Sequence, residues 1–339
     1  MRQAKIVTAD RFSVESTPVP RLQGPGELRL RTAACGICSG DLMPWYLQRK
    51  AGSVLGHEVV GWAADVGPAV TGIRPGDLIF VHHHAPCMDC CECRRGAFVH
   101  CPAWRQSKLD PGGMAEWIRV PAGIVQHDCF PVRDLGVEQA VFIEPLACTV
   151  KALSRLPVLE GSTGMVVGCG VMGLLNIAGA RVRGAARVVA VEPDETRRRA
   201  ALAFGADAAL TPGEAAETCR HLADFVVIGP GHPDIIVNSL DYVRPGGTAL
   251  LFTPTPTATL TALDLGELYF REVSLVPSYS CGPADTRLAC RWLQDGLVHP
   301  ERLITHRFDL EHVQEAYDTA RGGGPALKVL VTFPPGGSP

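Results

Sequence analysis

The feature that most constrains the fold is a glycine-rich turn between an apolar strand and an apolar helix. In the segment MVVGCGVMGLL, glycines stand at 168, 170 and 173, with Val171 and Met172 between the last two. The first glycine permits a tight turn, the second lets the backbone approach a pyrophosphate, and the third lets the helix pack on the strand. The helix N-terminus then faces the phosphates. The segment predicts a dinucleotide-binding turn formed by Gly168, Gly170, Val171, Met172 and Gly173.

The strand after this turn bears on which nicotinamide the site accepts. It reads RVVAVE and ends at Glu192, 19 positions after Gly173. A carboxylate there can accept hydrogen bonds from the adenosine ribose hydroxyls and would repel a 2′-phosphate, which favours NAD. Arg197, Arg198 and Arg199 open the next helix, and one of them, with Arg197 as our candidate, would pair with a 2′-phosphate if Glu192 turned away. NAD is the expected cofactor, and NADP stays open.

The chain of 339 residues is long enough for two domains, and its pattern changes after about residue 145. Before that point, short β-rich runs alternate with Gly and Pro turns, as in an irregular, mainly β domain. After it, strands alternate with helices, which predicts a doubly wound parallel sheet of the Rossmann type. The C-terminal segment is too small to fold alone. We expect a first domain of 1–147 completed by 280–339, and a dinucleotide domain of 148–279.

Five of the thirteen cysteines lie within one short segment, CMDCCECRRGAFVHC. Cys87, Cys90, Cys93 and Cys101 follow the pattern C-x2-C-x2-C-x7-C. Four thiolates at this spacing can close tetrahedrally around one Zn²⁺ and leave no position for substrate. Because such a loop has little apolar mass to order it, we expect a structural zinc site, with Cys91 as the odd thiol.

The neighbouring histidines and the dispersed cysteines have simpler interpretations. His82, His83 and His84 are expected on alternating faces of a strand end rather than in a metal cluster. The remaining thiols that we interpret are expected to be buried core residues: Cys35, Cys129, Cys148, Cys219, Cys281 and Cys290.

Composition excludes several classes of function. The chain is 46% hydrophobic and 20% charged with a formal net charge of −3, which is typical of a soluble globular protein and lacks the basic excess of a nucleic-acid binder. No stretch approaches the roughly 18 consecutive apolar residues that span a bilayer, and MRQAKIVTADRF lacks the apolar core of a signal peptide. We expect a cytoplasmic protein with neither a nucleic-acid nor a membrane partner.

Several further motifs occur in the order found in one enzyme superfamily. They are CGIC followed by Asp41, GHE at 56–58, the cysteine loop, EPLAC at 144–148, the glycine turn, VRPGG at 243–247 and the ending ITHRFDLEHVQEAYDTA. From about residue 25 to about 331, this set resembles the zinc-containing medium-chain dehydrogenases. The motif EPL resembles their polyol (sorbitol) and threonine dehydrogenase branch. The resemblance implies an α/β protein in which a GroES-like, mainly β catalytic domain accompanies a Rossmann-type domain.

The resemblance also implies a catalytic zinc. By position, Cys38 rather than Cys35 matches the metal-binding cysteine. His57 and Glu58 match the next two ligands, and Glu144 matches the fourth. Asp41 is a reasonable hydrogen-bond partner for His57. In such enzymes zinc polarises a carbonyl or acidifies an alcohol, while hydride passes between the substrate carbon and the nicotinamide.

One part of the family pattern is missing. The family usually places Ser or Thr two positions after the cysteine ligand, and many members place a histidine five positions after it, to carry a proton outward. This chain has Gly40 and Met43 there, and neither side chain can exchange a proton. We expect Ser39, or Glu58 or Glu144 through a water molecule, to take the acid–base role.

The resemblance implies a zinc-dependent oxidoreductase that interconverts a secondary alcohol and a ketone on a polyhydroxylated substrate, such as a sugar alcohol, a cyclitol or an amino sugar. The Ala, Arg, Gly and Pro richness is typical of a high-GC genome, in which enzymes similar to this family also modify aminoglycoside-type metabolites. Two alternatives stay open: an NADP-preferring ketone reductase with a solvent-derived proton, and a non-catalytic NAD(P)- and zinc-binding regulator. The resemblance implies a homodimer or homotetramer, for which a strand edge near TALLFT, 248–253, is a candidate contact.

Overall fold

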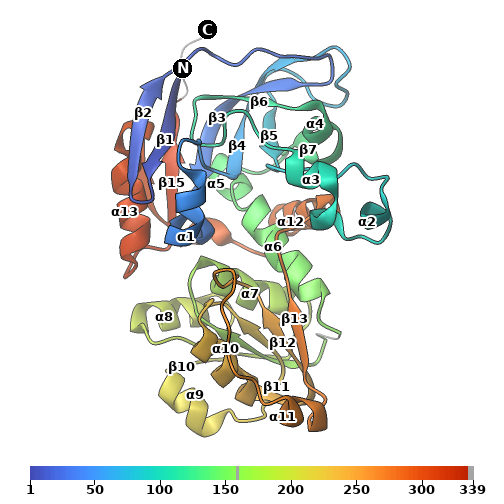
Figure 1. The fold of residues 1–339 in the computed structure, drawn as a ribbon, viewed down its shortest axis with the longest axis vertical. Helices are drawn as coiled ribbons and strands as arrows, with labels where there is room; N and C mark the ends of the chain where they lie inside the picture. Colours follow the sequence, from blue (N-terminus) through green and yellow to red (C-terminus); the bar gives the residue numbers. More distant parts are fainter. Residues whose placement is uncertain (158–159, 335–339) are drawn as a thin grey trace. The chain divides into compact units, whose positions relative to one another are not determined.

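The computed structural model describes residues 1–157 and 160–334 and divides the chain into two compact units (Figure 1). Unit 1 comprises Met1–Ala147 together with the segment that begins at Cys281, and unit 2 comprises Cys148–Ser280. The first division falls within helix α6 (Ile143–Ser154). No helix in the described part of the chain is both long and apolar enough to cross a membrane.

Unit 1 is built on a mixed, mainly antiparallel sheet in the order β14-β15-β3-β4-β5-β7, with β6 also paired to β3. Its strands are β3 (Leu28–Gly36), β4 (Glu58–Val66), β5 (Leu78–Val81), β6 (Trp117–Val120), β7 (Cys129–Pro131), β14 (Ile304–Phe308) and β15 (Lys328–Thr332). β15 pairs antiparallel with β3, so the C-terminal segment completes the sheet of the N-terminal one.

Alternating burial explains why this sheet forms. Leu28 and Leu30 of β3 are fully buried, whereas Arg29 and Arg31 between them are only partly covered, as expected for a strand with one face on a core. A separate hairpin of β1 (Arg2–Thr8) and β2 (Arg11–Ser16) packs on helix α13 (Val313–Gly322). There the rings of Phe12 and Tyr317 stack with centroids 4.0 Å apart.

The other helices of unit 1 are short apart from α12. They are η1 (Ser39–Leu42), α1 (Pro44–Leu47), η2 (Gln48–Lys50), α2 (Cys91–Arg94), η3 (Phe98–His100), α3 (Pro102–Gln106), α4 (Ala122–Asp128), α5 (Val137–Ala140), α12 (Pro283–Gln294), η5 (Pro300–Leu303) and η6 (Leu310–His312).

Unit 2 is a parallel sheet in the order β10-β9-β8-β11-β12-β13. Its strands are β8 (Thr163–Val167), β9 (Arg187–Val191), β10 (Ala208–Leu210), β11 (Ala223–Ile228), β12 (Val243–Leu251) and β13 (Ser274–Pro277). Its helices are α7 (Val171–Val182), α8 (Glu195–Ala203), α9 (Pro212–Thr218), α10 (Pro233–Ser239), η4 (Leu240–Tyr242) and α11 (Leu265–Phe270). This is the doubly wound order, and it reverses between β8 and β11, where such sheets bind their ligands.

The fold class expected from the sequence is confirmed, but the expected edge near TALLFT is wrong. That segment belongs largely to β12, which pairs with β11 on one side and with β13 on the other. The edges of the described sheet are β10 and β13. β13 has only four residues, so its local pattern is a weak indication of a strand beyond β12.

Candidate metal and cofactor sites

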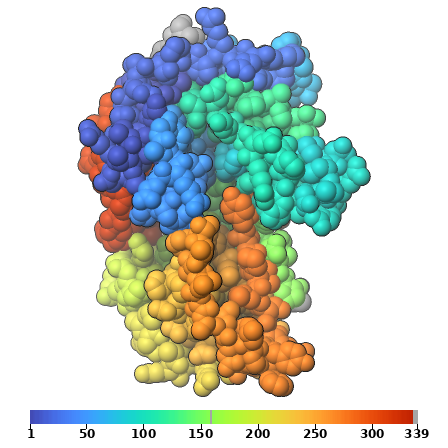
Figure 2. All heavy atoms as spheres, in the orientation of Figure 1, coloured from blue at the N-terminus to red at the C-terminus, as the bar shows by residue number. Residues whose placement is uncertain are grey.

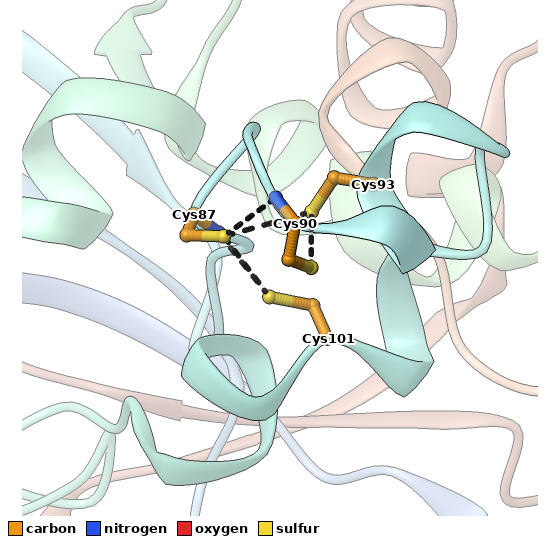
Figure 3. A group of neighbouring side chains, drawn as sticks. All are labelled: Cys87, Cys90, Cys93 and Cys101. Atoms are coloured by element: carbon orange, nitrogen blue, oxygen red, sulfur yellow. Dashed lines mark hydrogen bonds between the residues drawn. The ribbon is translucent and has the colours of Figure 1, made fainter.

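The cysteine loop of unit 1 gathers four thiols at metal-binding distance. The sulfur atoms of Cys87, Cys90, Cys93 and Cys101 all lie within 4.8 Å of one another. The Sγ separations are 3.6 Å for Cys90–Cys93, 3.6 Å for Cys87–Cys101 and 4.0 Å for Cys87–Cys93 (Figure 3). Sulfur atoms on a tetrahedral zinc, with Zn–S bonds of about 2.3 Å, stand about 3.8 Å apart. The arrangement therefore fits one zinc ion with no position left for a substrate.

The lobe that carries these thiols, residues 87–107, has a very small core of its own. Cys93, Val99, Cys101 and Trp104 form it, and Figure 2 shows this part of the chain, in teal, projecting from the body of unit 1. Burial raises the pKa of Cys93 to about 12, whereas backbone N–H donors outweigh burial at Cys101 and lower its pKa to about 6. A bound dication would favour ionisation of all four thiols. Cys91 is exposed and lies outside the group.

A second metal-binding group joins two segments through the pairing of β3 with β4. Cys38 follows β3 and precedes η1, while His57 precedes β4 and Glu58 opens it. Because Gly36 is the register partner of Glu58, the antiparallel pairing brings the two segments together. The potential ligand atoms of Cys38, His57 and Glu58 all lie within 4.8 Å of one another. The family resemblance implied that these three residues share one site, and the structure brings their potential ligand atoms together.

Two buried charges flank this group. The Asp41 carboxylate lies 3.3 Å from Nδ1 of His57, and the Lys328 ammonium lies 2.5 Å from Oε2 of Glu58. Burial lowers the pKa of His57, but Asp41 and Cys38 outweigh burial and raise it well above its ordinary value. Burial likewise lowers the pKa of Lys328, and Glu58 more than compensates, so that it stays charged.

The donor set fits a catalytic zinc. A thiol, an imidazole and a carboxylate are ligands that zinc binds, and Oε1 of Glu58 is buried without a hydrogen-bond partner among the described residues. An orphaned buried carboxylate oxygen is costly unless a cation binds it.

Glu144 lies beside a different pair of potential ligands. It is buried in the first turn of α6, and its carboxylate forms a group within 4.8 Å with His82 and His83, which follow β5. The rings of His83 and His57 have centroids 4.9 Å apart. Burial, together with the neighbouring imidazoles, lowers the pKa of His83 well below its ordinary value, so its ring is neutral. His83 thus stands between the Cys38 group and Glu144.

The residues around Cys38 carry no ordinary proton relay. Gly40 donates its backbone N–H to Sγ of Cys38 at 3.4 Å, and a Cβ at Gly40 would lie 3.5 Å from that sulfur, an ordinary contact. A serine at 40 would therefore fit, so the missing hydroxyl has no steric cause. Ser39 is exposed at the start of η1.

In unit 2, the glycine turn follows β8 at the position where the strand order reverses. Gly168 has φ +86°, and a Cβ on Gly173 would lie 1.9 Å from the carbonyl oxygen of Gly168. A Cβ on Gly170 would meet nothing within 4 Å. Helix α7 begins at Val171, so the N–H groups of Val171, Met172 and Gly173 belong to its first turn and are available to an anion. The turn fits a pyrophosphate.

Glu192 and the arginines after it have different hydrogen-bond partners. The Glu192 carboxylate accepts hydrogen bonds from the backbone N–H of Cys169 at 2.7 Å and of Asp194 at 3.1 Å. Arg198 donates to the carbonyls of Glu192 and Pro193, and Arg199 pairs with Glu195. The Nε of Arg197 is buried without a hydrogen-bond partner among the described residues, whereas Arg198 and Arg199 have the partners given above.

Comparison with known proteins gives the family. The family described as alcohol dehydrogenase GroES-like domain matches residues 24–134, and the family described as zinc-binding dehydrogenase matches residues 171–295. L-threonine 3-dehydrogenase of Pyrococcus abyssi (strain GE5 / Orsay) is 30% identical over 318 residues, which cover 88% of this chain and 89% of that protein. The chain belongs to the zinc-binding dehydrogenases.

Two further proteins match over nearly the whole chain. Sorbitol dehydrogenase of Bombyx mori is 28% identical over 342 residues, covering 95% of this chain and 96% of that protein. A solved structure from Sinorhizobium meliloti 1021, described as a zinc-binding dehydrogenase bound to NADP, is similar with a TM-score of 0.88 and 26% identity. That similarity covers 98% of this chain and 99% of the other.

Sequence reasoning missed two residues that lie beside the group of Cys38, His57 and Glu58. Lys328 is fully buried at the start of β15, and its sequence signal was a lysine opening the apolar strand KVLVT. His83 was expected on one face of a strand end, but β5 stops at Val81 and the three histidines lie beyond it. Nothing in the local pattern distinguishes His83 from His82 and His84.

Proposed function

We propose that this protein is a zinc-dependent oxidoreductase that interconverts a secondary alcohol and a ketone on a polyhydroxylated substrate with NAD or NADP. The observation that carries the proposal is the Cys38, His57 and Glu58 group, flanked by the buried charges of Asp41 and Lys328. Zinc bound there would polarise a carbonyl or acidify an alcohol, and the nicotinamide would carry the hydride.

The surrounding residues would prepare this group for the metal. Cys38, His57 and Glu58 would hold zinc, with Glu144 as the fourth ligand. Nδ1 of His57 lies at ion-pair distance from Asp41, and this contact would leave Nε2 of that ring for the metal. Lys328 occupies Oε2 of Glu58 and leaves Oε1. In this arrangement Asp41 orients His57 and Lys328 orients Glu58, and neither contacts the atom that would bind the metal.

Proton transfer would fall to Ser39, or to Glu58 or Glu144 through a water molecule. The exposure of Ser39 supports a route to solvent. Ser39→Ala and Glu144→Gln, assayed separately and with the zinc content of each variant measured, would show whether either side chain acts. A variant that keeps its zinc but loses roughly 10²- to 10⁴-fold in kcat/KM would identify the acid–base group. Losses below about tenfold in both would exclude Ser39 and Glu144 as the acid–base group.

The relatives support a polar, hydroxylated substrate. Two of them are named for the polyols sorbitol and D-arabinitol, and one is named for L-threonine, an amino acid with a single hydroxyl group. A sugar alcohol, a cyclitol or an amino sugar, the last two as in aminoglycoside-type biosynthesis, would suit this site. The test is a panel of these compounds and their keto forms, followed by the absorbance of reduced nicotinamide with both cofactors, and with Cys38→Ser as the matched control.

Three outcomes of this panel would separate the candidates. Turnover by the wild type and none by Cys38→Ser supports a zinc-dependent dehydrogenase. Reduction of ketones with NADPH alone would indicate a ketone reductase with a solvent-derived proton. Binding of cofactor and of two zinc ions per chain without any turnover would indicate a non-catalytic regulator.

NAD is the cofactor that we infer first. The buried Glu192 carboxylate lies where a 2′-phosphate would be repelled. Arg197 keeps NADP open, and the relative from Sinorhizobium meliloti was solved with NADP. Titration of the protein fluorescence with NADH and NADPH would decide between them. A preference for NADPH that Arg197→Ala abolishes would reverse our inference.

The compartment and the assembly follow from other observations. None of the thirteen cysteines forms a disulfide bond, which supports a reducing compartment and the cytoplasm. We infer a homodimer or homotetramer that uses β13, an edge of the sheet in unit 2, since exposed hydrophobic side chains, Tyr269 and Phe270, lie on the preceding helix α11. Sedimentation equilibrium of the whole protein tests this, and a monomer at micromolar concentration would contradict it.

A further inference from the structure

Three consecutive histidines follow β5, and the first of them is fixed at both ring nitrogens. Nδ1 of His82 lies 2.8 Å from Oδ2 of Asp128, and its Nε2 lies 3.6 Å from Sγ of Cys281. Asp128 also accepts a hydrogen bond from Oγ1 of Thr286 at 2.6 Å. All four side chains are fully buried, so His82 is part of a closed network between α4 and α12.

The third histidine is fixed on the opposite side, by the cysteine lobe. Nδ1 of His84 contacts the backbone oxygen of Ser107, and the His84 ring lies against Trp104 with centroids 4.3 Å apart. Trp104 belongs to the small core that includes the zinc-binding Cys101. His84 therefore attaches the segment after β5 to the lobe.

The middle histidine is directed toward the zinc site instead. The His83 ring packs against that of the ligand His57, and its own ligand atom lies within 4.8 Å of a carboxylate oxygen of Glu144. Nδ1 of His83 is buried and has no hydrogen-bond partner among the described residues. A buried ring nitrogen without a partner is unfavourable, and a metal ion would satisfy it.

We propose that His83 is an additional ligand of the catalytic zinc, which it binds from the side of Glu144. The inference rests on the proposed function, because it assumes a metal held by Cys38 and His57. Lys328 already occupies one oxygen of Glu58, and Glu144 groups with His83 rather than with Cys38 and His57. His83 lies between His57 and Glu144. Its neighbours, His82 and His84, hold the backbone in place on either side of it.

The test is the binding of Co²⁺ to the catalytic site of the whole protein, with zinc retained in the cysteine lobe. Visible absorption of Co²⁺ reports its ligands, and chelator competition gives its affinity. We expect His83→Ala and His83→Gln each to lower the affinity for Co²⁺ by at least about tenfold and to change its absorption bands. Having two substitutions of different size guards against a failure of one variant to fold, which melting temperature would detect.

Two control variants separate this inference from the proposed function. His312→Gln, at an exposed histidine that pairs with Asp309, should keep the wild-type affinity and spectrum. Cys38→Ser should lose the catalytic Co²⁺. Wild-type affinity and spectrum in both His83 variants would overturn the role of His83 while leaving the zinc centre intact. Retention of the wild-type Co²⁺ spectrum by Cys38→Ser would instead overturn the zinc centre itself.

Discussion

Gly170 and Gly173 have different surroundings, so substitution of each by alanine should separate an effect on cofactor binding from an effect on the stability of the fold. A Cβ on Gly173 would lie 1.9 Å from the Gly168 oxygen, whereas a Cβ on Gly170 would meet nothing. We expect Gly173→Ala to lower the melting temperature and to abolish cofactor binding. Gly170→Ala should melt like the wild type but bind NADH at least tenfold more weakly, because its methyl group would occupy the space of the pyrophosphate. Equal melting temperatures for both variants would contradict this.

Single residues of the zinc site were predictable only where a motif marks them. Cys38, His57 and Glu58 lie in short characteristic segments, and the pairing of β3 with β4 joins them. Lys328 and His83 reach the same site from distant positions in the chain, and no local pattern encodes their partners. Lys328 is separated from Glu58 by 270 positions, so only the completed sheet shows the ion pair.

At the scale of elements, the ion pair between Lys328 and Glu58 connects β15 to β4. Both side chains are almost fully buried. Removing one partner leaves an uncompensated charge, which typically costs about 3–5 kcal/mol. We expect Lys328→Met to lower the free energy of unfolding by this amount in urea denaturation. Lys5→Met, whose partner Glu15 is exposed, should cost less than about 1 kcal/mol. Similar losses in both variants would contradict the assignment.

Glu116 links the hairpin of β1 and β2 to the rest of unit 1. The Glu116 carboxylate accepts a hydrogen bond from the backbone N–H of Arg2 at 2.7 Å and pairs with the Arg2 guanidinium at 2.6 Å. Burial raises the pKa of Glu116, but these bonds outweigh burial and lower the pKa below its ordinary value. A carboxylate with a depressed pKa stabilises the fold above its unfolded pKa, and that contribution is lost as the pH falls through the folded value.

The pH dependence of a single variant therefore tests this attachment. At neutral pH, Glu116→Gln should be less stable than the wild type by up to about 1 kcal/mol, since both side chains are partly exposed. The difference should begin to shrink below about pH 4.3, the unfolded pKa of Glu, and should disappear below the folded pKa. Urea denaturation of both proteins, at neutral pH and at a pH below the folded pKa, measures this difference in stability. A difference that does not change with pH would argue against the ion pair.

For the whole molecule, the alternation of strand and helix patterns along the sequence was sufficient to predict the fold class. Apolar strands alternating with helices predicted the parallel sheet of unit 2, because strands buried on both faces read as continuous apolar runs. The edge of that sheet was not predictable, since β13 is short and only half-buried. The pairing of the C-terminal β15 with β3 likewise depends on contacts between residues far apart in the chain.

We infer that unit 1 holds two zinc ions of different kinds, one closed within four thiolates and one reactive at Cys38. Anomalous diffraction from crystals of the purified protein, recorded on both sides of the zinc absorption edge, would locate both ions. We expect two peaks per chain, one among Cys87, Cys90, Cys93 and Cys101, and one beside Cys38 and His57. A single peak in the cysteine lobe, from protein that turns over its substrate fully, would contradict it.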